Sequence, residues 1–253
     1  MNSLLKVVEL RKKFGGVVAL DGVSFSLSNN CIKAIIGPNG AGKTTIFNII
    51  SGVYSPSSGK ILFKGERIDR LRAHLIVKKG ISRTFQNVQV FPNMTTVENV
   101  MVGLHSQTKS EFLACIFKLR SARREERKIY SRAMELLEFV GLQEKANRPV
   151  DTLTFHQQRL VEIARALATE PVLLLLDEPA AGLNIKETQQ MAKLIYKIKE
   201  MGISILLVEH DMDLVMDISE EVVVLNSGKV IAEGTPREIQ NNEKVIATYL
   251  GRE

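Results

Sequence analysis

A glycine-rich stretch near the start of the chain has the residues needed to hold a phosphate group. It consists of Gly37, Pro38, Asn39, Gly40, Ala41, Gly42, Lys43, Thr44 and Thr45. Glycines let the backbone curl so that successive N–H groups face an anion, and a following helix adds the positive end of its dipole. In the pattern G-x-x-x-x-G-K-[ST], the lysine reaches the β- and γ-phosphates and the hydroxyl binds Mg²⁺. We therefore expect a P-loop that binds a nucleoside triphosphate, with Lys43 on the phosphates and Thr44 on the metal.

The residues on either side of this loop predict the elements that must position it. The apolar run 32–36 predicts a buried strand, and the apolar run 46–50 predicts part of a helix. Strand, glycine loop and helix in this order distinguish a P-loop from an ordinary glycine turn.

A pair of carboxylates follows another apolar run, residues 173–176. Asp177 and Glu178 come directly after it. Ligands bind beyond the carboxyl ends of parallel strands, so both side chains should lie near the phosphates. There Asp177 would join the Mg²⁺ shell, and Glu178 would position and polarise the attacking water. Without the P-loop upstream, the same pair would be interpreted as acidic residues in a solvated loop.

Isolated polar and aromatic residues at other predicted strand ends are weaker candidates. Gln86 follows the predicted strand 82–85 and has an amide that can bind both a metal and water. His210 follows the apolar strand 204–208 and could donate to a γ-phosphate. Phe14 could cover a bound base, or it could close the end of a strand. Alone, each of these residues would be interpreted as an ordinary surface or structural residue.

The pattern of apolar residues divides the chain into three parts. Short alternating segments before the loop, at 7–10, 17–20 and 23–27, are typical of an antiparallel layer. Residues 90–152 have helical signals and few strand signals. The last third alternates strands with helices, which indicates a parallel sheet covered on both faces, and residues 226–228 predict a hairpin turn. Helices are expected at 69–79, from 95 or 96 onward, 133–140, 157–168, 185–201 and 212–218.

Composition limits the class of protein. The 253 residues are 45% hydrophobic and 25% charged, which fits one large domain or two small ones. No apolar run approaches the roughly 18–20 residues that span a bilayer, and the first residues lack a signal-peptide pattern, so we expect a cytoplasmic protein. Cys31 and Cys115 are isolated in the sequence and suggest neither a disulfide framework nor a metal site.

The net charge of +6 would allow contact with nucleic acid or an anionic membrane. Much of it is local, at Arg120, Arg123, Arg124, Arg127 and Lys128, with Glu125 and Glu126 between them. No aromatic residues alternate with these charges, as a surface that stacks bases would need. We interpret the stretch as a solvated helix face and expect no nucleic-acid partner.

Together, these motifs resemble the ATP-binding subunits of ABC transporters, in the right order and over nearly the whole chain. Gly37–Thr45 matches the Walker A motif, and Leu173–Glu178 matches Walker B followed by the catalytic glutamate. Gln86 falls at the Q-loop, His210 at the switch histidine and Phe14 at the aromatic A-loop. The family's signature motif, which contacts the partner's ATP, corresponds to Leu153, Thr154, Phe155, His156 and Gln157.

The resemblance implies an α/β fold of the P-loop NTPase (ABC ATPase) class, with a RecA-like mixed sheet core, an antiparallel β subdomain and an α-helical subdomain. It implies one nucleotide-binding domain over 1–253, with its core at 1–89 and 158–253 and a helical subdomain at about 90–157. ATP and Mg²⁺ would be the cofactors. Thr44, Gln86 and Asp177 would bind the metal, and Glu178, His210 and Gln86 would act in hydrolysis.

Several segments look like the LivG-type subunit of branched-chain amino-acid importers. They are residues 83–86, 177–184, 209–212, the ending from 234 to 251 and the insertion near 105–132. This similarity implies an ATPase that powers import of branched-chain or related hydrophobic amino acids, at the cytoplasmic face of the membrane. Its partners would be two permease subunits, a second ATP-binding subunit (a different chain or a second copy) and, indirectly, an extracytoplasmic substrate-binding protein.

One residue departs from the family pattern. His156 stands where the signature motif usually has glycine, which lets backbone N–H groups approach the γ-phosphate. Either the histidine weakens that composite site and leaves an asymmetric pair, which we favour, or a protonated imidazole replaces the lost contact. Asn184 is a smaller departure, because many members have aspartate there.

Two other functions remain as alternatives. A soluble ABC ATPase acting on nucleic acid or ribosomes is suggested by the basic charge, but such proteins usually carry two cassettes or a long coiled-coil insertion. A regulatory ATP-binding subunit with weak hydrolysis is suggested by His156, but intact Lys43, Asp177 and Glu178 argue against it.

Overall fold

The computed structural model describes residues 3–104 and 120–250. These divide into two compact units, one formed by Met1–Gln86 with Val172–Glu253 and the other by Asn87–Pro171. The second boundary differs from the expected residue 157, because helix α6 (Phe155–Leu167) belongs to the second unit. Cys115 and residues 105–119 of the expected insertion lie outside the described residues.

A six-stranded sheet forms the centre of the first unit, in the order β10-β9-β3-β8-β7-β6. Its strands are β3 (Ile32–Ile36), β6 (Ile81–Arg83), β7 (Leu173–Asp177), β8 (Ser204–Val208), β9 (Glu221–Asn226) and β10 (Lys229–Gly234). Every residue of β3, β7 and β8 is buried, which explains their mainly apolar sequences. The paired strands are parallel except β10, which turns back against β9 through the predicted hairpin, so the sheet is mixed.

A four-stranded antiparallel sheet lies in the same unit, in the order β2-β1-β4-β5. Its strands are β1 (Leu5–Phe14), β2 (Val17–Leu27), β4 (Ser58–Phe63) and β5 (Glu66–Arg67). Strand β2 is continuous where the sequence suggested two segments. Strand β5 was not predicted, and its two residues are both exposed.

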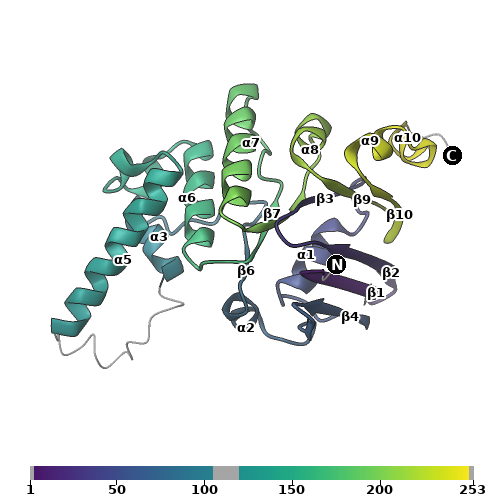
Figure 1. The fold of residues 1–253 in the computed structure, drawn as a ribbon, viewed down its shortest axis with the longest axis horizontal. Helices are drawn as coiled ribbons and strands as arrows, with labels where there is room; N and C mark the ends of the chain where they lie inside the picture. The colour runs from purple at the N-terminus through teal and green to yellow at the C-terminus, as the bar shows by residue number, and fades with distance from the viewer. Residues whose placement is uncertain (1–2, 105–119, 251–253) are drawn as a thin grey trace. The chain divides into compact units, whose positions relative to one another are not determined.

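Helices cover the six-stranded sheet on both faces. Helix α1 (Lys43–Ile50) buries Ile46, Phe47 and Ile49 in one apolar core shared by both sheets. Helices α7 (Ile185–Glu200) and α8 (Met212–Ile218) lie on the other side of the sheet from α1 (Figure 1). The short helices α9 (Pro236–Gln240) and α10 (Glu243–Leu250) follow β10.

Helix α2 (Ala73–Lys78) is shorter than the helix expected over 69–79. The reason is that Asp69 does not start a helix, because its buried side chain is bonded to residues of β4 and β5. Its carboxylate accepts the backbone N–H of Ile61 at 3.0 Å and pairs with Arg67 at 2.9 Å.

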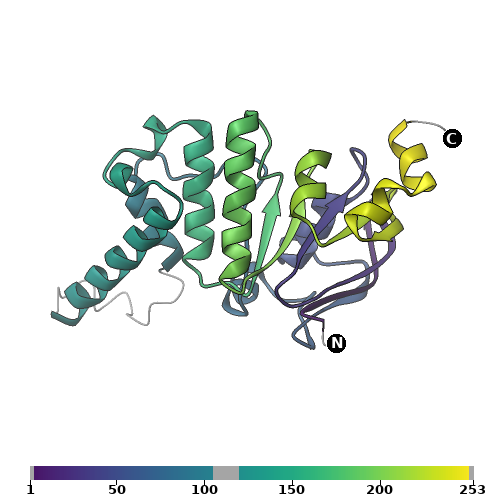
Figure 2. The same ribbon diagram turned by 45° about the horizontal axis from the view of Figure 1, so that its top comes forward.

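The second unit is helical, as the sequence pattern indicated. Helices α3 (Thr96–Leu104), α5 (Arg120–Phe139) and α6 pack together, with short 3₁₀ turns at Gln143–Lys145 and Val150–Thr152 (Figures 1 and 2). A Cβ at Gly103 would lie 2.2 Å from the carbonyl oxygen of Arg165, so α3 and α6 can approach this closely only with glycine there. This contact fixes α6 in the helical unit. None of the described helices is long and apolar enough to cross a membrane.

Candidate active site

The glycine loop between β3 and α1 is tightly held by the strands around it. A Cβ at Gly37 would lie 2.1 Å from the carbonyl oxygen of Leu225 in β9. Gly42 has φ of 105°, and a Cβ there would lie 2.6 Å from the side chain of Leu20. Both positions therefore require glycine, for space at the first and for space and backbone conformation at the second. The loop and the start of α1 are thereby fixed against both sheets.

Lys43 is the first residue of α1, and its ammonium lies inside the loop. It is 5% exposed and donates to the carbonyl oxygens of Gly37 at 2.7 Å and Pro38 at 2.9 Å. Burial lowers the pKa of Lys43, and the negative charges of Glu178 and Asp177 oppose that shift. The ammonium therefore interacts electrostatically with the carboxylates of Glu178 and Asp177. Bonds to neutral carbonyls are weaker than bonds to a phosphate, so an entering phosphate can displace them.

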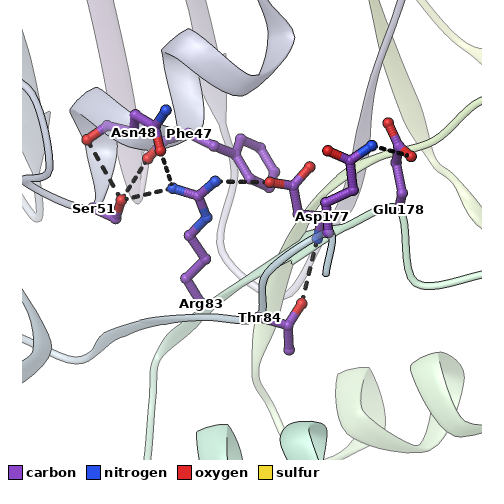
Figure 3. Close-up of polar contacts among 8 residues, drawn as sticks. Phe47, Asn48, Ser51, Arg83, Thr84, Asp177 and Glu178 are labelled. Atoms are coloured by element: carbon purple, nitrogen blue, oxygen red, sulfur yellow. Dashed lines mark hydrogen bonds and ion pairs between the residues drawn. The ribbon is translucent and has the colours of Figure 1, made fainter. Parts of the chain in front are cut away.

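Asp177 ends β7 and is held from β6. The Nη2 of Arg83 lies 2.7 Å from the Oδ2 of Asp177, and this ion pair is almost fully buried (Figure 3). The backbone N–H of Asp177 also points to the hydroxyl of Thr84, at 3.4 Å. Sequence reasoning noted Arg83 as part of a family segment but assigned it no role at the site.

Glu178 brings the predicted catalytic residues together. Its Oε1 lies 2.9 Å from the Nε2 of His210, and its Oε2 accepts from the Nε2 of Gln86 at 2.9 Å. A carboxylate oxygen accepts hydrogen bonds, so this contact suits an imidazole that donates from Nε2. Glu178 also has a φ of 49°, and its backbone N–H donates to the carbonyl oxygen of Val208 at 2.8 Å. The strands β6, β7 and β8 thus place all three side chains at one sheet edge.

Sequence reasoning placed Glu209, the residue before His210, in a family segment but assigned it no role at the site. It is 3% exposed, and its Oε1 accepts the backbone N–H of Ala180 at 2.7 Å. Its Oε2 accepts the N–H groups of His210 at 3.0 Å and Asp211 at 3.4 Å. Burial raises the pKa of Glu209, the N–H bonds oppose that shift, and the charge of Glu178 adds to it. This carboxylate therefore ties the loop after Glu178 to the segment that carries His210.

Phe14 ends β1 with its ring 41% exposed. The ring makes an edge contact with Tyr54, at 5.3 Å between centroids, and the ammonium of Lys12 lies 4.9 Å from its centre. Tyr54 carried no sequence signal. An exposed ring that is held along one edge can stack on a flat base, so the position of Phe14 is compatible with covering a bound base.

The signature residues lie in the second unit, at the start of α6. Thr154 caps the helix: its hydroxyl accepts from the N–H of Gln157 at 3.3 Å, and the side chain of Gln157 accepts from the N–H of Thr154 at 3.2 Å. Leu153 is buried, Phe155 is exposed, and His156 is half-buried in the first turn. The helix begins at Phe155, two residues before the expected start, because this capping box fixes its first turn.

The residues expected to bind a metal fit Mg²⁺ in their chemistry. Thr44, Gln86 and Asp177 offer hydroxyl, amide and carboxylate oxygens, which are the hard ligands that Mg²⁺ prefers. Within residues 3–104 and 120–250, no group of three or more His, Cys, Asp or Glu side chains could hold a metal alone. That is consistent with an ion bound through few protein ligands, waters and substrate phosphates.

A model of the ABC transporter family matches residues 20–181, which is more than half of the chain. The chain belongs to the ABC transporter family. A second model, of branched-chain amino acid ATP-binding cassette transporters, matches residues 229–253 of this ABC subunit.

Curated relatives of this ABC subunit cover nearly its whole length. It is 48% identical over 249 residues to the high-affinity branched-chain amino acid transport ATP-binding protein BraF of Pseudomonas aeruginosa, covering 98% of each chain. It is 45% identical over 249 residues to LivG of Escherichia coli, which has the same description and again 98% of each chain covered.

Solved structures of ABC transporter cassettes have the same fold. An ATP-binding cassette in its ADP conformation aligns with a TM-score of 0.87 at 32% identity, covering 99% of this chain and 100% of the other. A nucleotide-free cassette aligns with a TM-score of 0.86 at 33% identity, covering 98% and 99%. The expected ABC ATPase fold is confirmed by these alignments.

Proposed function

We propose that this chain is the ATP-hydrolysing subunit of an importer for branched-chain or related hydrophobic amino acids. The observation that carries the hydrolysis is Glu178, held between His210 and Gln86 at 2.9 Å on each side and next to Asp177. The substrate class is supported by the names of the curated relatives and by the family model that matches the C-terminal residues.

The roles of the site residues follow from their positions. Lys43 binds the β- and γ-phosphates, and Phe14 stacks on the adenine base. Thr44, Asp177 and Gln86 would hold Mg²⁺, which would neutralise charge on the phosphates. Glu178 positions the attacking water and takes its proton. His210 orients Glu178 and can donate to the γ-phosphate.

The subunit works as half of a pair. A related cassette, 27% identical over 92% of this chain, is described as a dimer bound to ADP and phosphate. In our proposal, the segment 153–157 of each subunit completes the ATP site of its partner. The pair sits on two permease subunits at the cytoplasmic face of the membrane, and an extracytoplasmic protein delivers the amino acid.

We favour a weakened composite site where this subunit's His156 meets the partner's ATP. A side chain in the first turn of α6 occupies space that glycine would leave to the phosphate. His156→Gly should then raise ATP hydrolysis by the reconstituted transporter. An unchanged rate would contradict the weakening, and a lower rate would show that the imidazole replaces the lost contact.

Capture of the complex tests the transport function. A tagged chain is purified from detergent-solubilised membranes of its own cell, and the proteins that co-purify are identified. We expect two polytopic proteins and a second ATPase. Reconstituted in vesicles and supplied with the extracytoplasmic binding protein, this complex should accumulate leucine, isoleucine or valine only with ATP. Glutamate is the negative control and should not accumulate. Recovery of ribosomes or nucleic acid alone would overturn the proposal in favour of the soluble alternative.

A further inference from the structure

Arg83 is a buried cation between helix α1, which follows the Walker A motif, and the end of the Walker B strand β7. Its side chain is 6% exposed, and its guanidinium lies over the rings of Phe47 and Phe85, at 5.6 and 5.1 Å from their centres. One terminal nitrogen, Nη2, binds the Oδ2 of Asp177 at 2.7 Å. Burying a cation costs free energy unless the cation is paired and hydrogen-bonded. The guanidinium of Arg83 is therefore held in place by these partners.

The other terminal nitrogen of Arg83 reaches helix α1. Nη1 donates to the Oδ1 of Asn48 at 2.7 Å and to the hydroxyl of Ser51 at 3.1 Å (Figure 3). That hydroxyl donates in turn to the carbonyl oxygen of Phe47 at 2.7 Å. Arg83 therefore connects the end of β7 to the C-terminal end of the helix whose first residues are Lys43 and Thr44.

We propose that Arg83 is a positioning residue for the metal site. It holds the carboxylate of Asp177 in a fixed place relative to α1, so that the Asp177 and Thr44 oxygens stay correctly spaced for Mg²⁺. The inference rests on the proposed function, because it concerns the same nucleotide site. The planar fork of arginine is required, since a lysine ammonium is a single point and cannot bind both elements with the same geometry.

The test is the Mg²⁺ dependence of nucleotide binding, measured apart from hydrolysis. A fluorescent ATP analogue is bound to the full chain in EDTA and then while Mg²⁺ is titrated. Outer partners of metal ligands typically contribute about 10- to 100-fold to metal affinity. We expect Arg83→Gln to raise the half-saturating Mg²⁺ concentration by about that factor, with binding in EDTA changed by less than about twofold. Arg83→Lys should give an intermediate shift.

Arg67 provides a matched control. It pairs with Asp69, whose side chain is as buried as that of Asp177, but it lies on the edge strand β5. Arg67→Gln and Arg67→Lys should leave the Mg²⁺ dependence unchanged. Asn48→Ala removes an anchor of Arg83 without touching Asp177, so it should give a smaller shift in the same direction and serves if Arg83→Gln does not fold.

Each outcome has a defined meaning. Folded Arg83 variants with the Mg²⁺ dependence of the wild type would overturn the inference. A lower Mg²⁺ requirement would overturn it too, because Arg83 would then compete with the metal for Asp177. If the wild-type chain itself shows no Mg²⁺-dependent binding, the proposed function fails rather than the role of Arg83.

Discussion

Asp177 and Glu178 are adjacent at the end of β7, yet their side chains have different kinds of partner. The Asp177 side chain is 1% exposed and is bound from β6 by the buried guanidinium of Arg83. The Glu178 side chain is 13% exposed, and its partners His210 and Gln86 are exposed side chains.

This difference suggests that the Asp177 carboxylate is fixed, whereas the Glu178 carboxylate can move. A buried, doubly anchored pair is little screened by water and salt, whereas contacts between exposed groups contribute little and break easily. A metal ligand benefits from being fixed. A group that must position water, release product and reset benefits from partners that can move. We therefore expect changes at Arg83 to alter metal-dependent binding and changes at His210 to alter turnover. Gln86, which follows β6 but contacts Glu178, should affect both.

The largest expected effect on the β8 side comes from His210→Ala. General acid–base groups contribute about 10²- to 10⁴-fold, so kcat should fall within that range because Glu178 loses its orienting partner. ATP binding should fall much less than turnover, because Lys43 and the P-loop still hold the phosphates when the contact from His210 to the γ-phosphate is lost. His74→Ala, an exposed histidine on α2, is the control. An equal loss of binding and turnover would break the comparison.

Glu209→Gln should give the next largest effect. All three contacts of this carboxylate come from backbone N–H donors, and glutamine would replace one of its two accepting oxygens with an NH₂ group that faces at least one of them. A buried group left unpaired costs about 1–3 kcal/mol of unfolding free energy, and a displacement of about 1 Å at a reacting group can cost 10²-fold in rate. We expect both losses in urea unfolding and steady-state hydrolysis. Lower stability with normal kcat would show that Glu209 does not position His210.

A smaller effect is expected for Gln86→Ala. Gln86 is neutral and exposed, and a typical hydrogen bond of this kind contributes about 0.5–1.5 kcal/mol, or roughly 2- to 10-fold in rate. Gln190→Ala, on an exposed face of α7, is the matched control. A loss as large as that of His210→Ala would show that the two partners of Glu178 act as one unit.

The smallest effect concerns pH and stability. Because the pKa of Glu209 is raised in the folded state, folding favours its protonated form. Its contribution to stability is therefore present near the ordinary glutamate pKa of about 4.3 and is lost as the pH rises through the raised value. The unfolding free energy of wild type minus that of Glu209→Gln should shrink between about pH 4.5 and neutrality. A difference that grows with pH would mean that the N–H bonds outweigh burial.

The sequence pattern predicted the strands and helices around this site, because these elements follow from local sequence signals. Strands β3 and β8 and helix α8 have the expected bounds, since uninterrupted apolar runs and the intervening polar residues define them. The position of Glu178 at a strand end could be foreseen for the same reason. The boundary of the helical unit could not, because it depends on the close contact of α3 with α6.

The supporting residues could not be predicted from local pattern. Arg83 and Asp177 are 94 positions apart, and no periodicity indicates that their strands are adjacent. Glu209 looks like any charged residue after a strand, and only its burial against Ala180 shows what it does. The residues proposed to bind ATP lie in recognisable sequence motifs, whereas the residues that hold them in place depend on tertiary packing.

The most direct test of the division between Asp177 and Glu178 compares Asp177→Asn with Glu178→Gln in the same two assays. Glu178→Gln should lower turnover by at least about 100-fold while Mg²⁺-dependent ATP binding stays close to wild type. Asp177→Asn should lose the Mg²⁺ dependence of binding itself. Wild-type turnover in Glu178→Gln, or wild-type Mg²⁺ dependence in Asp177→Asn, would contradict the account.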